Sequence, residues 1–285
     1  MFLSGISDEA GKDIATQIRA HKELGWDHIE LRLVDGTNIT QLDDNAFGRV
    51  AGAIDESRLK VSCFGSAIAN WARPITCDEN LDRDDLKRAI PRMKRLKCPF
   101  IRVMSYPNHP DEPLPEREWR REAIRRMKYL AGMAEDGGVT LVHENCSGWG
   151  GQSAENSTIL LGEVASPALK LVFDTGNPVD YRQDAWEYYR AVLPDIVYVH
   201  VKDARRVNGE VQYVYCGEGD GYVREILSDL VERSYDGGVS IEPHLAAVIH
   251  TGKAADSAAQ LYDSYVEYGR RLMGIVSETG TARVG

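Results

Sequence analysis

Four ionisable side chains lie at the C-terminal ends of four successive β-rich runs in the second half of the chain. They are Glu144, Asp174, His200 and Glu242. If neighbouring strands bring them together, the three carboxylates repel one another, and a buried carboxylate without a partner is costly. A divalent cation removes that cost, and three oxygen donors with one imidazole suit Mn²⁺, Mg²⁺, Co²⁺, Fe²⁺ or Zn²⁺. The residue types therefore predict one divalent-metal site.

Strand alternation predicts that the four side chains face the same space. With Glu144 pointing inward, Val142 points the same way and His143 faces the opposite side. A rival zinc site built on His143 and Cys146 would need two more ligands, and none is convincingly spaced. A single acid at the end of a strand can equally well have an ordinary structural role. Four metal-compatible residues on successive strands favour a metal site instead.

The segments that must position these residues alternate between β-rich runs and helical patterns. The runs are Phe2–Ile6, His28–Leu33, Lys60–Phe64, Phe100–Ser105, Val139–His143, Lys170–Phe173, Ile196–Val201 and Val239–Ile241. The helical patterns cover roughly 11–25, 43–58, 78–97, 115–136, 153–165, 184–193, 222–235 and 253–276. Eight strands, each followed by a helix, are what a closed (β/α)8 barrel needs. The predicted fold class is α/β, a single TIM barrel over 1–276 with a C-terminal tail over 277–285.

An open doubly wound sheet shares this alternation of strands and helices. It normally has a glycine-rich first turn, and the segment GISDEAGKD lacks the GxGxxG pattern. Within the barrel, we expect Pro91 to kink or divide the third helix and a small hairpin to form around Val211–Tyr215. Active sites of such barrels lie at the C-terminal ends of the strands, where the four candidate ligands stand.

The composition indicates a globular chain. Of its 285 residues 43% are hydrophobic, and the longest uncharged apolar stretches reach only strand length, so no membrane span is predicted. The 34 Lys and Arg against 44 Asp and Glu give a net charge of −10, which disfavours nucleic-acid binding. Five scattered cysteines without CxxC spacing, and an N-terminus without signal-peptide features, predict a cytoplasmic protein.

Seven short segments together resemble one superfamily. They are Ile6–Glu9, Leu24–Arg32, Val61–Ser66, Val142–Asn145, Phe173–Asn177, His200–Asp203 and Ile241–Glu242. In order and spacing they resemble the xylose-isomerase-like TIM barrels, which include ketose 3-epimerases, inosose dehydratases, hydroxypyruvate isomerases and endonuclease IV. The resemblance implies that Glu144, Asp174, His200 and Glu242 bind the metal. It also implies that Glu144 and Glu242 flank the substrate and shuttle a proton through an enediolate.

The resemblance also assigns substrate contacts. Arg206 matches an arginine that reaches substrate oxygens in ketose 3-epimerases. The chain departs from those enzymes at two substrate-contacting positions, where it has Asn177 in place of histidine and Gly150 in place of glutamate. The His200–Asp203 segment is closer to inosose dehydratases. The further histidine ligands of endonuclease IV are missing, in agreement with the acidic net charge.

Other residues near the predicted site have two interpretations each. Lys202 shares the inward parity of His200 and either meets a substrate oxygen or pairs with an acid. Glu9 either lines the mouth or simply starts a helix. Trp149 and Trp71 either offer a flat face to sugar C–H groups or pack in the core.

Glu30 and Arg32 form a candidate ion pair at the top of the second strand, or one of them touches substrate. Asp203 is a candidate for orienting a metal ligand.

These residues favour a sugar isomerase or epimerase that acts on a small polyhydroxylated ketose or related carbonyl compound and uses one divalent ion, Mn²⁺ before the others. The first alternative is a lyase or dehydratase of the inosose dehydratase or keto-glycoside type. The second is a non-catalytic barrel or a subunit that needs a partner. The expected partner is a free sugar or cyclitol, because no glycine-rich phosphate cradle follows the last strands. Self-association into a homo-oligomer stays open.

Overall fold

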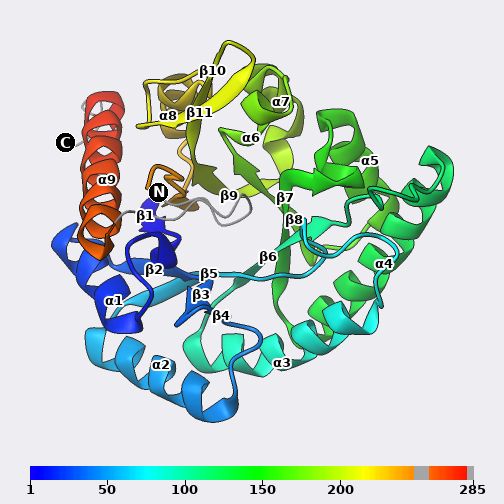
Figure 1. The fold of residues 1–285 in the computed structure, drawn as a ribbon, viewed down its shortest axis with the longest axis horizontal. Helices are drawn as coiled ribbons and strands as arrows, with labels where there is room; N and C mark the ends of the chain where they lie inside the picture. Colours follow the sequence, from blue (N-terminus) through cyan, green and yellow to red (C-terminus); the bar gives the residue numbers. More distant parts are fainter. Residues whose placement is uncertain (247–256, 281–285) are drawn as a thin grey trace.

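Eight parallel strands form one sheet in the order β1-β12-β9-β8-β7-β6-β5-β2 in the computed structural model, which describes residues 1–246 and 257–280. The strands are β1 (Phe2–Gly5), β2 (His28–Leu31), β5 (Lys60–Gly65), β6 (Phe100–Ser105), β7 (Thr140–Gly148), β8 (Leu169–Asp174), β9 (Ile196–Val201) and β12 (Gly238–Ile241). A parallel bridge between Ile6 and Glu30 joins the two ends of the sheet. The predicted barrel is therefore confirmed (Figure 1).

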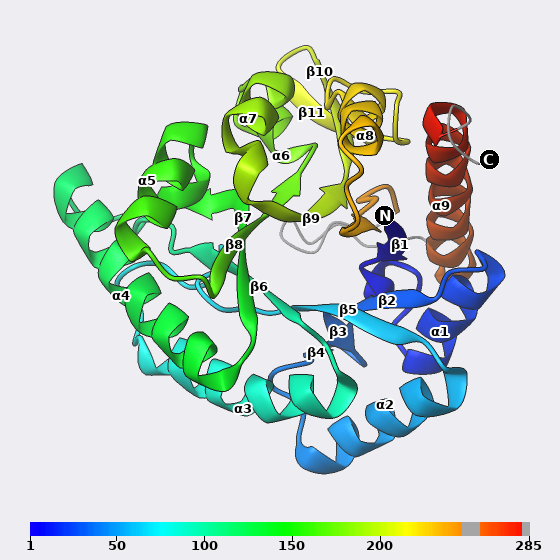
Figure 2. The ribbon, with the colours of Figure 1, turned by 180° about the vertical axis from the view of Figure 1, so that it is seen from behind.

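Long helices surround the strands on all sides, as the views from the front and from behind show (Figures 1 and 2). They are α1 (Ile14–Glu23), α2 (Asp44–Ser57), α3 (Asn80–Leu96), α4 (Glu116–Gly137), α5 (Ala154–Val164), α7 (Ala185–Val192), α8 (Val223–Glu232) and α9 (Ala258–Gly280). Asp13, Asp43, Ser153 and Asp184 cap the N-termini of α1, α2, α5 and α7 by accepting a backbone N–H.

Two sequence expectations about helices have a different outcome. Pro91 does not divide α3, which is assigned as one helix from Asn80 to Leu96 with the proline inside. The helix α9 continues past residue 276 to Gly280, whereas residues 281–285 lie outside the described part of the chain. The expected start of this helix near residue 253 also lies outside the described residues.

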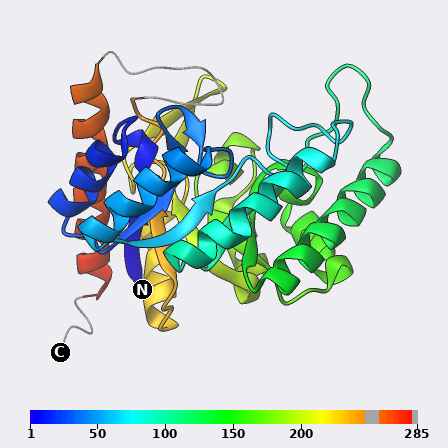
Figure 3. The ribbon, with the colours of Figure 1, turned by 90° about the horizontal axis from the view of Figure 1, so that it is seen from below.

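Short elements build the rim at the C-terminal ends of the strands. The hairpin expected near Val211–Tyr215 is present as β10 (Asp203–Val207) and β11 (Glu210–Val214). The sequence did not predict a second hairpin, β3 (Leu33–Val34) with β4 (Thr37–Asn38), or the single turn α6 (Asn177–Asp180). Among the described residues there are also three 3₁₀ turns, η1 (Ser7–Glu9), η2 (Trp149–Gly151) and η3 (Leu193–Asp195). Figure 3 shows the N-terminus at the end of the barrel opposite the long loop after β6.

The barrel interior confirms the predicted side-chain parity. Cys63, Val142, Val172 and Tyr198 form a buried cluster separate from the two larger clusters under the helices. Residues two positions further along β7, β8 and β9 are therefore directed toward the same axis, at the C-terminal end. No helix among the residues that the structure describes is long and apolar enough to cross a membrane.

Candidate metal centre

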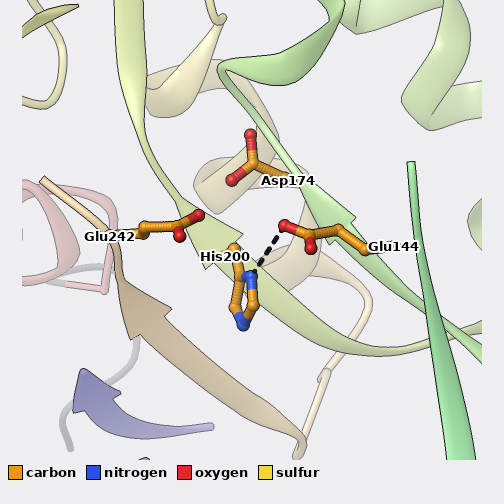
Figure 4. Close-up of side chains that lie close together, drawn as sticks. All are labelled: Glu144, Asp174, His200 and Glu242. Atoms are coloured by element: carbon orange, nitrogen blue, oxygen red, sulfur yellow. Dashed lines mark hydrogen bonds and ion pairs between the residues drawn. The ribbon is translucent and has the colours of Figure 1, made fainter. Parts of the chain in front are cut away.

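The four predicted ligands meet at the C-terminal ends of β7, β8, β9 and β12. Asp174 and His200 are register partners on the paired strands β8 and β9, and the amide of Glu242 donates to the carbonyl of Val201. One potential ligand atom from each of Glu144, Asp174, His200 and Glu242 lies within 4.8 Å of all the others. All four side chains are buried. Figure 4 shows Glu144 and Glu242 reaching toward each other from opposite sides, with His200 and Asp174 between them.

The imidazole of His200 is held from both sides. Its Nδ1 lies 3.2 Å from Oε1 of Glu144, and its Nε2 lies 3.2 Å from both carboxylate oxygens of Glu30. Ser240 Oγ donates to Glu30 at 2.7 Å and fixes that carboxylate. Burial opposes the imidazolium form, but Glu30 and Glu144 outweigh it and raise the pKa of His200 well above its ordinary value. Glu30 is thus placed to keep a proton on Nε2 and leave Nδ1 facing the other carboxylates.

Three buried cations contact the same carboxylates. Arg102 lies 3.3 Å from Oε2 of Glu144. Lys202 Nζ lies 3.3 Å from Asp174 and 3.2 Å from Glu242. Arg32 donates to Glu242 at 2.8 Å.

These cations act unequally on the acids. Burial opposes ionisation of Glu144, yet Arg102 and His200 hold the pKa of Glu144 at about 2. At Asp174, burial and repulsion from Glu242 and Glu144 outweigh Lys202 and raise the pKa to about 7. Asp174 is therefore the acid of the cluster that most needs an added positive charge.

Two buried carboxylate oxygens support the fit to a metal ion. Oε2 of Glu144 and Oδ2 of Asp174 each lie 3.3 Å from a cationic side chain but accept no hydrogen bond. A buried acceptor without a hydrogen bond is costly, and coordination to a cation removes the cost. Three carboxylates and one imidazole form a donor set typical of a hard or borderline divalent ion. This buried cluster could therefore hold one such ion.

The neighbouring acids each have defined partners. Glu30 contacts His200 and Ser240, whereas Arg32 contacts Asp8, Glu9 and Glu242, so the two are not each other's main partners. Glu9 accepts from both the backbone N–H and Nδ1 of His244, at 2.8 and 2.9 Å.

Asp203 orders a loop. Its carboxylate accepts the amides of Ala204, Gly217, Gly219 and Gly221, and in this way it shapes the chain from 203 to 221.

A cavity of about 330 Å³ opens above the cluster. Its walls include the two glutamates Glu144 and Glu242, the cations Arg32, Arg102 and Lys202, and Asn177. Nδ2 of Asn177 is buried and has no hydrogen-bond partner. Lys202 and Asn177, both predicted to bind substrate, are thus brought together with the candidate ligands. Arg102 was not predicted to belong to the site. An arginine inside a β-rich run does indicate a buried acidic partner, because arginine is rarely buried without one.

Three predicted substrate residues are not among the described residues that line this cavity. The guanidinium of Arg206 donates to the carbonyls of Val179, Asp180 and Gly209, at 3.1, 2.6 and 2.8 Å. The indole of Trp149 is buried and donates to Glu116 on α4. Glu9 contacts Arg32 and His244 instead.

A family model described as xylose isomerase-like TIM barrel matches residues 18–265. The chain belongs to this family. The match covers all the candidate ligands, so the predicted resemblance is confirmed.

Curated relatives and solved structures of xylose isomerase-like barrels are similar to this chain. The chain is 25% identical over 156 residues to an inosose dehydratase of Bacillus thuringiensis, a match covering 49% of this chain and 52% of the relative. It thus spans about half the length of the curated relatives it matches. A D-tagatose 3-epimerase-like protein superposes with a TM-score of 0.73 at 17% identity, over 98% of this chain and 99% of that one. IOLI protein with a bound zinc atom superposes with a TM-score of 0.74 at 16% identity, over 98% of this chain and 99% of that one. At such identities these two structures establish the fold alone.

Proposed function

We propose that the protein is a divalent-metal-dependent isomerase or epimerase of a small polyhydroxylated ketose or related carbonyl compound. The observation that carries the proposal is the approach of Glu144 and Glu242 from opposite sides of one buried cluster, under a cavity that a small ligand can enter. Two carboxylates on opposite sides of a substrate can remove a proton from one face or carbon and return it to another. We assign the metal to Glu144, Asp174, His200 and Glu242, with Mn²⁺ as the first ion to test.

The chain's own residues have separate parts in this reaction. A divalent ion held by the cluster would stabilise the negative charge of an enediolate. One glutamate takes the proton next to the substrate carbonyl, and the other, or the same one, returns it. Lys202 and Asn177 line the cavity, and Asn177 Nδ2 has no hydrogen-bond partner, so both side chains are available to donate to substrate oxygens. Glu30 keeps the imidazole of His200 in one orientation throughout.

The second candidate is a dehydratase or other lyase. It uses the same first proton abstraction but expels a group β to the carbonyl instead of returning the proton. The curated relatives named inosose dehydratase favour it. In this reaction the second glutamate protonates the leaving oxygen.

Deuterium incorporation separates these candidates. Mn²⁺-loaded protein is incubated in D₂O with ketoses, inososes and 3-keto-glycosides, and the products are followed by NMR. Isomerisation or epimerisation exchanges a C–H for deuterium without loss of water, whereas a lyase generates an enone or diketone. Absence of both from a metal-saturated protein across the panel contradicts an enzymatic role on these substrates and favours the non-catalytic barrel.

A further inference from the structure

The cavity has a mouth built from different residues than its floor. The floor holds the candidate ligands and the three cations. The mouth contains two large aromatic side chains, Trp71 and Tyr181, which are 44% and 42% exposed. Among the large hydrophobic side chains that are exposed in the described residues, these two alone line the cavity.

The two aromatics come from different sides of the barrel. Trp71 lies in the loop between β5 and α3, and Tyr181 directly follows α6, after β8. In the sheet, β8 and β5 are separated by β7 and β6, so their loops rise from well-separated points of the rim. Both loops nevertheless contribute to the wall of the same cavity.

The backbone next to each aromatic side chain is anchored by an arginine. Beside Trp71, the guanidinium of Arg73 forms ion pairs with Asp82 and Asp85 on α3, at 2.5 and 2.6 Å. Beside Tyr181, Arg206 binds the carbonyls of Val179 and Asp180 and so closes the end of α6. These contacts fix the two loop positions from which the aromatic side chains project.

The size of the cavity exceeds what the reacting ring needs. Its volume of about 330 Å³ falls within the roughly 300–1,000 Å³ of pockets that bury drug-sized ligands, which are larger than one six-membered ring. The charged side chains that line the cavity indicate what kind of group occupies the space not filled by the reacting ring. The cations that line the described walls, Arg32, Arg102 and Lys202, all contact the carboxylates of the floor. The mouth contributes the carboxylate of Asp180, which accepts from Tyr213, and this charge disfavours an anionic occupant.

We propose that Trp71 and Tyr181 form a second subsite for a neutral ring, joined to the polyhydroxylated ring that reacts at the floor. The substrate class is then a conjugate of two rings, in which the outer ring is a sugar or an aryl group. Both kinds of ring present C–H edges or π faces that stack on aromatic side chains. The inference rests on the proposed function for the inner ring and adds the outer one.

Calorimetry with unreactive ligands tests the subsite without any turnover. Mn²⁺-loaded protein is titrated with glucose, glucose 6-phosphate, cellobiose and phenyl β-glucoside. We expect cellobiose or phenyl glucoside to bind more tightly than glucose, and the tighter of the two identifies the outer ring as sugar or aryl. Tightest binding of the phosphate, or equal affinity for one-ring and two-ring ligands, would overturn the proposal.

Variants locate the effect at the two aromatics. We expect Trp71→Ala and Tyr181→Ala each to weaken the preferred two-ring ligand by about 3- to 10-fold and leave glucose unchanged. Trp71→Phe keeps a ring and should recover part of the loss. Tyr129→Ala is the matched control, because Tyr129 is also exposed but lies on α4 outside the cavity. Equal weakening of both ligand classes, or no weakening in either variant, contradicts the subsite. The calorimetric test requires no turnover, so it can be interpreted even when the deuterium experiment shows no reaction.

Discussion

Asp174 is the ligand whose charge depends most on what occupies the cluster. Its pKa is about 7 in the folded protein, because burial and two neighbouring acids raise it, against an ordinary value of 3.8. Between these values the folded protein holds a proton that the unfolded chain has released, so metal-free stability from this group falls as pH rises from about 4 to 7. Metal must displace the same proton. Nδ1 of His200 must also lose a proton before it can bind the ion, and the pKa of His200 is raised well above its ordinary value. We therefore expect divalent-ion affinity, measured by calorimetry, to rise with pH through about 7 and to keep rising above it. A pH-independent affinity would contradict this role.

Removing the ligand charge gives the matching mutational test. We expect Asp174→Asn to fold, because the carboxyl is already largely uncharged below pH 7, and to lose both metal and activity. Metal content by elemental analysis and folding by circular dichroism report the two effects separately. Full metal stoichiometry in a Glu144→Ala/Asp174→Ala double variant would show that the metal binds elsewhere.

The two glutamates differ from the other ligands in having a proton to carry. Glutamine keeps an oxygen donor but cannot act as a base, so we expect Glu144→Gln and Glu242→Gln to retain some metal while kcat falls by about 10²-fold or more. His200→Gln should act mainly through metal affinity and recover activity as metal is added. Near-normal turnover in both glutamine variants would show that the carboxylates are ligands only.

At the scale of elements, α6 is the segment that the site depends on and that the sequence did not predict. It spans one turn, Asn177–Asp180, and carries Asn177 into the cavity. Arg206 from the β10–β11 hairpin holds the carbonyls at its end. We expect Arg206→Ala to lower stability by about 1–2 kcal/mol, because carbonyls lose a charged donor, and to raise KM more than it lowers kcat. If Arg206 instead touches substrate, KM rises with an unchanged melting temperature.

The sequence predicts those features of the fold and the site that are encoded by residues close together in the chain. The eight barrel strands and their helices are encoded in runs of residues with clear boundaries, and a one-residue alternation sufficed to direct Glu144 and Asp174 inward. Glu30 could not be assigned to His200, because β2 and β9 are not neighbours in the sheet and meet only across the barrel interior. Likewise, elements of two to four residues, such as β3, β4 and α6, contain too little pattern to recognise.

At the scale of the whole molecule, the folded barrel brings together charged side chains that the unfolded chain keeps far apart. The net charge of the chain is −10, and the floor of the cavity concentrates Glu30, Glu144, Asp174 and Glu242 against three cations. Since these carboxylates come together only when strands far apart in sequence have assembled, the unfolded chain offers no comparable site. A metal that binds here binds the folded state alone, and its binding energy becomes folding stability.

Chelation should therefore unfold the protein at a lower temperature. At a free ion concentration about 100 times Kd, binding contributes about 2.7 kcal/mol, which corresponds to a rise of roughly 5–10 °C in Tm for a chain of this size. We expect EDTA to remove this increment and added Mn²⁺ to restore it, as followed by thermal melting in circular dichroism. The Glu144→Ala/Asp174→Ala variant is the control, because it keeps the fold's surface but lacks two ligands. An equal Mn²⁺-dependent shift in that variant would mean that the ion stabilises the barrel from some other place.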